Sequence, residues 1–292
     1  MDGVLVIDKP QGLTSHDVVA AARRALGETR IGHTGTLDPL ATGVLPLAIG
    51  RATRLVRFLT ASDKDYDATI RFGFTTDSYD VTGTETGRTD AAPSEDDVAR
   101  AVESLRGEYL QMPPAFSAKK VDGRRAYAHA RRSEPVALAP APVRVSRAEL
   151  LEITGTQARV ALTCSAGFYV RSFAHGLGEM VGTGACLEAL RRTRSGDFTL
   201  DAALTMTGLQ DAATVTTAFI SLDRLLPRFP AVQVGDQGRT FVTHGRELKA
   251  GDFEGSGAGA EWVRILDRQG ALLAMGAPGS TPDSLHPAVV LV

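Results

Sequence analysis

Two segments with alternating apolar residues constrain the fold most strongly. In residues 66–76, YDATIRFGFTT, every second residue from Tyr66 to Phe74 is aromatic or apolar. Residues 158–164, ARVALTC, alternate in the same way through Val160 and Leu162. A period of two residues predicts strands with one face on a core and the other toward solvent, which is typical of antiparallel sheets.

Three further segments predict helices between such strands. After the apolar strand VLVIDK, residues 16–26 place apolar side chains on one helical face, with a cap at Thr14 or Ser15 and a stop at Gly27. Ser94, with Asp97 three residues later, predicts a second helix start. SFAHGLGEMVG, residues 172–182, also has a helical pattern. The sequence therefore predicts an α+β fold with a mixed, mostly antiparallel sheet.

The pattern changes near residue 228, where short strand-like pieces begin. These are GRTFVTHG (238–245), residues 261–276 with a hairpin at 267–270, and AVVLV (288–292). We therefore predict two domains, residues 1–227 and a small β-rich module over residues 228–292. No apolar run is long enough for a membrane helix, and we expect a cytoplasmic protein whose two cysteines, Cys164 and Cys186, are reduced.

Charge is unevenly distributed along the chain. The formal net charge is only -2, but residues 61–110 hold twelve acids and five bases, whereas residues 119–147 hold eight bases and two acids. The basic residues belong to a proline-bounded excursion, about residues 112–147, between predicted strands. Long connections in compact domains are usually functional or disordered, so this basic excursion is a candidate for binding a polyanion.

One carboxylate, Asp38, stands out in GHTGTLDPLATG, residues 32–43. An Asp-Pro pair is often only a turn or a helix cap. Three glycines and three threonines around it also suit a tight backbone that presents one side chain into a cleft. The chain lacks phosphate-loop, dinucleotide-binding, zincin and GxSxG motifs. The role of Asp38 stays open from these residues alone.

Other candidates are equally ambiguous when each is taken alone. Tyr66 in DKDYDATI is either a sheet-packing residue or a site residue, and Arg171 in AGFYVRSFAHGLG is either a capping or a functional arginine. LRRTRSG, residues 190–196, is either a solvated basic helix end or a phosphate-binding cluster. His33 by itself is most often a structural or surface histidine.

Taken together, however, these motifs resemble one known family. IDKPQGLTSHDVV, GHTGTLDPLATGVLPLAIGRATR, KDYDATIRFGFTTDSYDVTGTE, QMPPAFSAKKVDGRRAYAHAR, GFYVRSFAHGLG and LRRTRSGDF occur in the order and spacing of the TruB family of tRNA pseudouridine synthases, over about residues 1–200. The resemblance implies a pseudouridine-synthase catalytic domain and a PUA-like RNA-binding domain at the C-terminus. It also implies isomerisation of uridine 55 in the T arm of tRNA, without a metal, a cofactor or an obligate protein partner. We expect a monomer.

The resemblance also implies roles for individual residues. Asp38, Tyr66 and Arg171 are then catalytic, and His33, Lys64, Tyr169 and Leu190 line the uracil pocket or contact RNA. Lys9 and Pro10 match a motif with a structural role. We expect phosphate contacts from the bases of the excursion and of LRRTRSG: Lys119, Lys120, Arg124, Arg125, Arg131, Arg132, Arg191, Arg192 and Arg194.

The implied reaction explains why one aspartate is enough. Glycosidases use two carboxylates because water must be activated or a leaving group protonated. Pseudouridine formation breaks the C1′–N1 bond, turns the uracil and joins C5 to C1′, so no water enters. Asp38 would act ionised, as a nucleophile at C1′ or as a base at C2′, with Arg171 favouring the charged form. The alternative is a non-catalytic protein that binds and folds tRNA.

Overall fold

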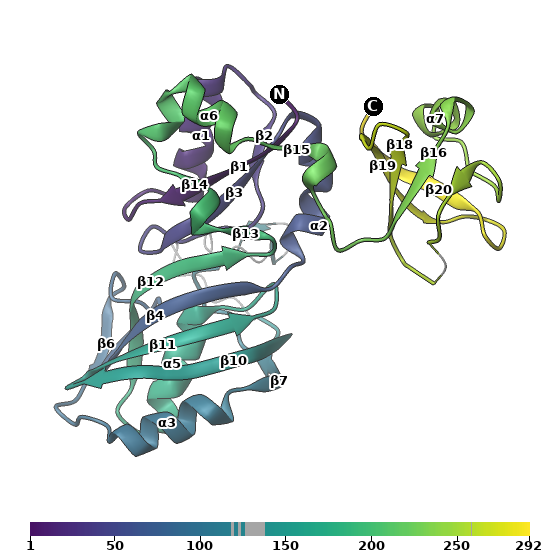
Figure 1. Cartoon of the computed structure of the whole chain (residues 1–292). Coiled ribbons are helices and arrows are strands. Elements are labelled where there is room, and N and C mark those ends of the chain that lie inside the picture. Colours follow the sequence, from purple (N-terminus) through teal and green to yellow (C-terminus); the bar gives the residue numbers. More distant parts are fainter. Residues whose placement is uncertain (118–119, 122–123, 126–137, 258) are drawn as a thin grey trace.

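The computed structural model describes residues 1–117, 120–121, 124–125, 138–257 and 259–292 (Figure 1). Within these residues the chain forms an 11-stranded sheet, a five-stranded sheet nearer the C-terminus and two short ribbons. The ribbons are β5 (Phe74–Thr76) with β6 (Glu85–Arg88), and β8 (Lys120–Val121) with β9 (Arg124–Arg125).

The large sheet is mixed and mostly antiparallel, as the alternating segments predicted. Its order is β14 (Ala203–Leu204), β1 (Gly3–Lys9), β3 (Thr42–Ile49), β12 (Ala185–Ser195), β4 (Lys64–Phe72), β11 (Gln157–Cys164), β10 (Ala141–Thr154) and β7 (Gly107–Gln111). β13 (Phe198–Thr199), β15 (Ile220–Ser221) and β2 (Ile31–His33) pair at its sides. Two pairs in this sheet, β1 with β14 and β3 with β12, are parallel.

The three predicted helices are confirmed as α1 (Ser15–Leu26), α3 (Glu95–Ser104) and α5 (Val170–Met180). Thr14 caps α1 in a capping box with Asp17, and Gly27 ends it at φ 61°. The described residues also form the short helices α2 (Val56–Thr60) and α6 (Ala212–Ala218), and the 3₁₀ helices Gly50–Leu55, Leu200–Ala202, Gly208–Gln210 and Leu222–Arg224. No described helix is long and apolar enough to cross a membrane.

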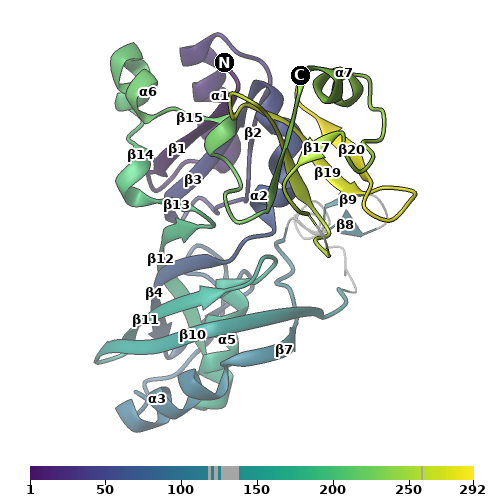
Figure 2. The same ribbon diagram turned by 45° about the vertical axis from the view of Figure 1, so that its right-hand side comes forward.

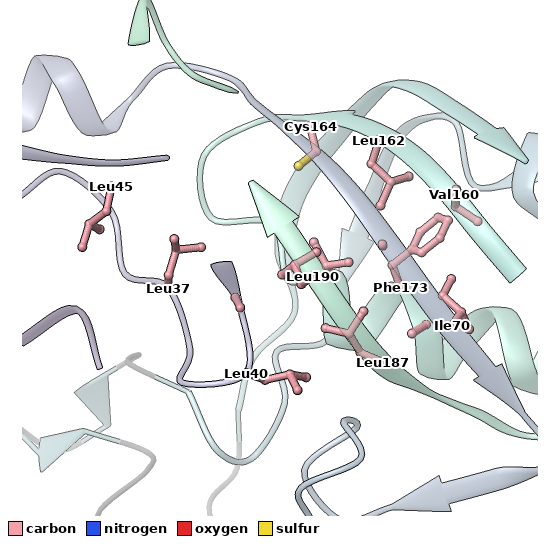
Figure 3. Close-up of a cluster of buried hydrophobic side chains, with 14 of the residues drawn as sticks. Leu37, Leu40, Leu45, Ile70, Val160, Leu162, Cys164, Phe173, Leu187 and Leu190 are labelled. Atoms are coloured by element: carbon pink, nitrogen blue, oxygen red, sulfur yellow. The ribbon is translucent and has the colours of Figure 1, made fainter. Parts of the chain in front are cut away.

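The core anchors the segment that carries Asp38. Leu37 and Leu40 on either side of it are buried in the same cluster as Ile70 of β4 and Phe173 of α5 (Figure 3). Burial of one leucine contributes about 1.5–3 kcal/mol relative to exposure. Two buried leucines therefore fix the backbone around Asp38 between them.

The C-terminal sheet has its own core and lies beside the large sheet (Figure 2). Its order is β17 (Phe253–Glu254), β16 (Ala231–Val234), β18 (Val263–Asp267), β19 (Leu272–Pro278) and β20 (Leu285–Val290). The predicted hairpin at 267–270 is present, with Gly270 at φ 84°. Arg51 Nη1 donates to Leu291 O at 2.6 Å and joins the two parts. The boundary at residue 228 stays a prediction.

The predicted strand at GRTFVTHG is wrong, because most of it lies in helix α7 (Asp236–Thr243). Thr240, Phe241 and Val242 favour a strand by their intrinsic propensity. Val242 is nevertheless fully buried in the C-terminal core, and Gly238 lets the helix approach β16 so closely that a Cβ would lie 2.8 Å from Val234. Tertiary packing overrides local preference here.

The basic excursion is shorter than predicted. Strand β10 begins at Ala141, so residues 141–147 belong to the large sheet, where Arg144 pairs with Asp63 at 3.1 Å and Arg147 pairs with Glu149. Lys120, Arg124 and Arg125 lie in the β8–β9 ribbon. Lys119, Arg131 and Arg132 lie outside the described residues.

Candidate active site

The segment between β2 and β3 presents Asp38 from a tightly bonded backbone. Ser15 of α1 donates its hydroxyl to Leu37 O at 3.0 Å and accepts from Leu37 N at 2.8 Å. Asp38 O accepts from Ala41 N at 3.0 Å, so the turn that Asp-Pro suggested is its local form. The backbone is fixed, while the side chain of Asp38 remains 44% exposed.

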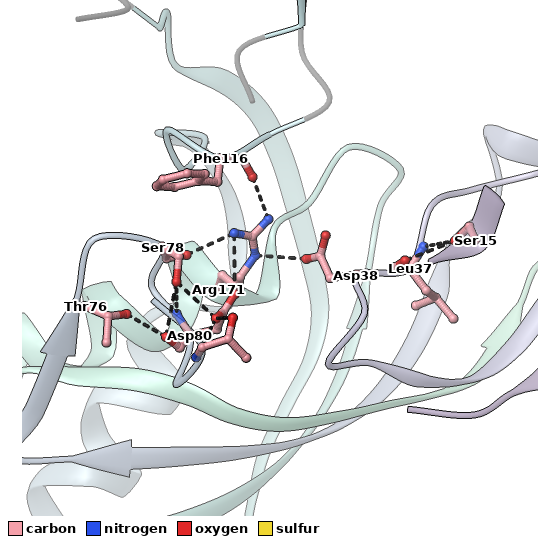
Figure 4. A network of polar contacts seen from close by, with 9 residues as sticks. Ser15, Leu37, Asp38, Thr76, Ser78, Asp80, Phe116 and Arg171 are labelled. Carbon is pink, nitrogen blue, oxygen red and sulfur yellow. Dashed lines mark hydrogen bonds and ion pairs between the residues drawn. The ribbon is translucent and has the colours of Figure 1, made fainter. Parts of the chain in front are cut away.

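Arg171, the second residue of α5, holds the carboxylate of Asp38 in place. Its Nε lies 2.9 Å from Asp38 Oδ2 (Figure 4). Its Nη1 donates to Ser78 O at 3.0 Å and its Nη2 donates to Phe116 O at 2.8 Å. The arginine side chain is only 7% exposed. Each of its three nitrogens thus has its own acceptor, which fixes the guanidinium group.

A second carboxylate, Asp80, lies on the other side of Arg171. Asp80 Oδ2 is 3.6 Å from Arg171 Nη1, and both side chains are almost completely buried. Asp80 Oδ1 accepts from Ser78 Oγ at 3.0 Å and from Thr82 N at 2.9 Å. Asp80 was not among the predicted site residues, because DSYDVTG, residues 77–83, has the residue types of an ordinary polar turn. The structure shows instead that Asp80 compensates part of a buried positive charge.

A cavity of about 250 Å³ opens beside the Asp38–Arg171 pair. Its lining includes six of the residues that the sequence analysis selected for catalysis or substrate binding: Asp38, Lys64, Tyr66, Tyr169, Arg171 and Leu190. His33 is not among its described lining residues; it lies in β2, where its Nδ1 accepts from Gly35 N at 3.4 Å. A larger cavity of about 760 Å³ in the C-terminal sheet shares none of these residues.

The three arginines of LRRTRSG lie on strand β12, so the interpretation as a basic helix end is wrong, whereas the phosphate-binding cluster stays a prediction. Arg192 is 1% exposed, and its guanidinium donates to Val44 O at 2.7 Å and to Gly35 O at 3.1 Å. Arg192 also lines the cavity, so any phosphate contact of this residue would have to form inside it, and the predicted contact stays a prediction. Arg191 pairs with Asp8 at 2.8 Å and Arg194 pairs with Asp65 at 2.7 Å, so acids already neutralise both.

Two lysines add buried positive charge near the cavity. Lys64 donates to Thr60 O and Ser62 O, and burial lowers its pKa to about 8, with the Arg192 charge acting in the same direction. Lys9 donates to Pro10 O at 2.9 Å and to Leu13 O at 2.6 Å. Burial also lowers its pKa to about 8, and the charge of Asp38 opposes this. Through its two hydrogen bonds to carbonyl groups, Lys9 stabilises the turn before α1.

Two tyrosines line the cavity between these charges. Tyr66 projects from β4, and burial raises the pKa of its phenol above the usual 10, although the nearby Arg192 acts in the opposite direction. Tyr169 immediately precedes α5, and burial raises the pKa of its phenol as well. Both phenols are therefore neutral at pH 7, and they supply aromatic surface beside Asp38.

Comparison with known proteins assigns the chain to a family. A family model described as "TruB family pseudouridylate synthase (N terminal domain)" matches residues 23–170, and "tRNA pseudouridylate synthase B C-terminal domain" matches residues 171–227. The chain belongs to the TruB family of pseudouridylate synthases. The "tRNA pseudouridine synthase B" of Solibacter usitatus (strain Ellin6076) is 45% identical over the whole length of both chains. The protein of the same name from Mycobacteroides abscessus is 44% identical, covering 93% of this chain and 92% of that one.

The architecture agrees with the TruB assignment. The structure titled "Crystal structure of the archaeal box H/ACA sRNP Nop10-Cbf5 complex" contains a chain that superimposes with a TM-score of 0.77 at 26% identity, covering 99% of this chain and 86% of that one. The predicted fold class, an α+β pseudouridine-synthase catalytic domain with a mixed sheet, is thereby confirmed. The PUA-like character of residues 228–292 stays a prediction.

Proposed function

We propose that this protein isomerises uridine 55 in the T arm of tRNA to pseudouridine. The observation that carries the proposal is the Asp38–Arg171 ion pair at a cavity with aromatic and aliphatic walls. Its TruB-family relatives bear the name tRNA pseudouridine synthase B, which supports both the reaction and the tRNA substrate. Monomeric state and cytoplasmic location remain predictions.

The charges of the site suit a reaction without water. Asp80 is buried and held by Arg171, Ser78 and Thr82, so it is not available to a substrate. Among the described lining residues, Asp38 alone presents a carboxylate to the cavity, and the guanidinium of Arg171 lies 2.9 Å from it. One accessible carboxylate cannot supply the acid and base pair of a glycosidase, but it suffices as nucleophile at C1′ or base at C2′.

Tyr66 has two candidate roles, as the base that accepts the C5 proton and as a surface that stacks on the uracil, and its environment supports stacking. The C5 proton must leave after the C5–C1′ bond forms, and a neutral phenol with a raised pKa is a weak acceptor for it. An aromatic side chain in the cavity can instead stack on the uracil ring. By either route Asp38 is a carboxylate again once the new bond has formed, and it can then accept the C5 proton.

Access to Asp38 requires that the target nucleotide leave its stack. Base flipping costs a few kcal/mol, which contacts elsewhere on the RNA must offset. The basic excursion is the segment whose charge suits phosphate contacts, and binding through it should weaken as salt rises. Since Arg191, Arg192 and Arg194 are paired or buried, we assign this role to the excursion rather than to β12.

The decisive experiment is tritium release from a T-arm stem-loop labelled at uridine C5. We expect release with the wild type and none with Asp38→Asn, while both bind the RNA with similar affinity. Asp67→Asn is the matched control, because Asp67 lies one residue from Tyr66 yet pairs with Arg159 outside the cavity. Binding without release by the wild type would instead support the non-catalytic tRNA-folding protein, and full activity of Asp38→Asn would refute the assigned chemistry.

A further inference from the structure

The carboxamide of Gln111 makes a two-point contact with the main chain beside the cavity. Gln111 ends strand β7 and is 6% exposed. Its Nε2 donates to Tyr169 O at 3.0 Å, and its Oε1 accepts from Tyr169 N at 2.8 Å. The side chain thus bonds both polar groups of one residue, as a neighbouring strand would.

This contact lies where α5 lacks a cap of its own. Tyr169 is the residue before the helix, and its side chain makes no capping hydrogen bond. The first turn is instead tied to residues 111–116: Ser172 Oγ donates to Met112 O at 2.8 Å, and Arg171 Nη2 donates to Phe116 O at 2.8 Å. Of these contacts, only the one from Gln111 bonds both the main-chain N–H and the main-chain carbonyl of Tyr169, the residue that precedes the helix.

We propose that Gln111 is a positioning residue for catalysis, which fixes Tyr169 and the start of α5 so that Arg171 meets Asp38. This inference rests on the proposed function. Tyr169 lines the cavity and Arg171 is only two residues further along. A displacement of about 1 Å at a reacting group can reduce the rate about 100-fold. A small displacement of Tyr169 would therefore lower the reaction rate.

The chemistry of the contact limits which side chains can replace glutamine. It needs a donor and an acceptor side by side, and a carboxamide provides both without charge. Methionine has similar length and neither group. Glutamate keeps an acceptor for Tyr169 N, but when ionised it turns an oxygen toward Tyr169 O; when protonated it regains a donor. The rest of α5 is secured by Phe173 and Leu177 in the core, so losing the contact disturbs the first turn rather than the helix.

The test compares single-turnover pseudouridine formation and RNA affinity in wild type, Gln111→Met and Gln111→Glu. For Gln111→Met we expect a rate about 10- to 100-fold lower, with the Kd for RNA changed less than about threefold. Val102→Ala is the control for destabilisation alone, because Val102 is a buried residue of α3 outside the cavity lining. It should lower the melting temperature and leave the rate unchanged at 25 °C.

The pH dependence of Gln111→Glu gives a readout that a purely structural role would not produce. Burial favours the protonated form of a glutamate at this position. The rate of Gln111→Glu relative to wild type should therefore rise at least about threefold as pH falls from about 8 to 5.5, because the donor to Tyr169 O returns. A flat ratio, or a Gln111→Met rate equal to that of the wild type, would overturn this inference alone. An inactive wild type would instead overturn the proposed function.

Discussion

Replacing Arg171 by lysine tests whether the charge or the shape of this residue matters. Arginine meets Asp38, Ser78 O and Phe116 O with three different nitrogens, at 2.9, 3.0 and 2.8 Å. A lysine ammonium is a single nitrogen on a flexible stem. A lysine here keeps the positive charge between Asp38 and Asp80. Its single nitrogen cannot reach Asp38, Ser78 O and Phe116 O at the same time.

The expected cost follows from the contacts that are lost. Each hydrogen bond that involves a charged group contributes about 1.5–3 kcal/mol, so losing two lowers stability by about 3–6 kcal/mol. For a chain of this size that corresponds to a melting temperature about 6–18 °C lower. Asp38 would also lose its fixed partner, and we expect the single-turnover rate to fall about 100-fold.

Arg171→Lys is compared with the wild type by thermal unfolding and by single-turnover tritium release at 25 °C. Arg159→Lys serves as the matched control, since Arg159 pairs with Asp67 on the exposed face of the sheet, where substitutions change stability by only about 0.5 kcal/mol. If Arg171→Lys retains the wild-type rate within threefold and melts within about 2 °C of the wild type, the argument from three separate acceptors is refuted.

Two further predictions concern the other cavity residues. Tyr66→Phe should keep at least about five times the rate of Tyr66→Leu in single-turnover assays, because stacking on a base contributes about 1–3 kcal/mol; equal rates for the two variants would contradict the stacking role. Lys64 has a folded pKa of about 8, below the 10.5 of the unfolded chain, so the unfolded state binds more protons between these values and stability rises with pH there. In urea unfolding, the stability of wild type relative to Lys64→Met should therefore increase by about 2 kcal/mol from pH 7.5 to 9.5, and an unchanged difference would show that burial does not lower this pKa.

Local patterns in the sequence were sufficient for the regular elements near the site. The cap at Thr14 and the stop at Gly27 act within a few residues, and the alternation in β4 and β11 reports which face is buried. The resemblance to the TruB family, carried by short motifs, also predicted Asp38, Tyr66 and Arg171, which the structure brings together around one cavity.

Charged residues were the point at which sequence reasoning failed. Arg192 looked like a surface cation because arginine is seldom buried, yet parallel pairing of β12 with β3 places it among the carbonyls of Val44 and Gly35. Asp80 looked like a turn residue, and only the approach of Arg171 gives it an electrostatic role.

The sequence by itself determined both ends of α1, the start of α3, the alternating strands and the aspartate of the GTLDP motif, because these depend on neighbours along the chain. The tertiary structure alone decided the partners of Arg171, which come from residues 38, 78, 80 and 116. It also decided that Gln111 meets Tyr169 and that residues 236–243 are helical. The physical reason is that burial and hydrogen bonding between distant segments outweigh local propensity wherever a charge or a helix start must be satisfied inside the protein.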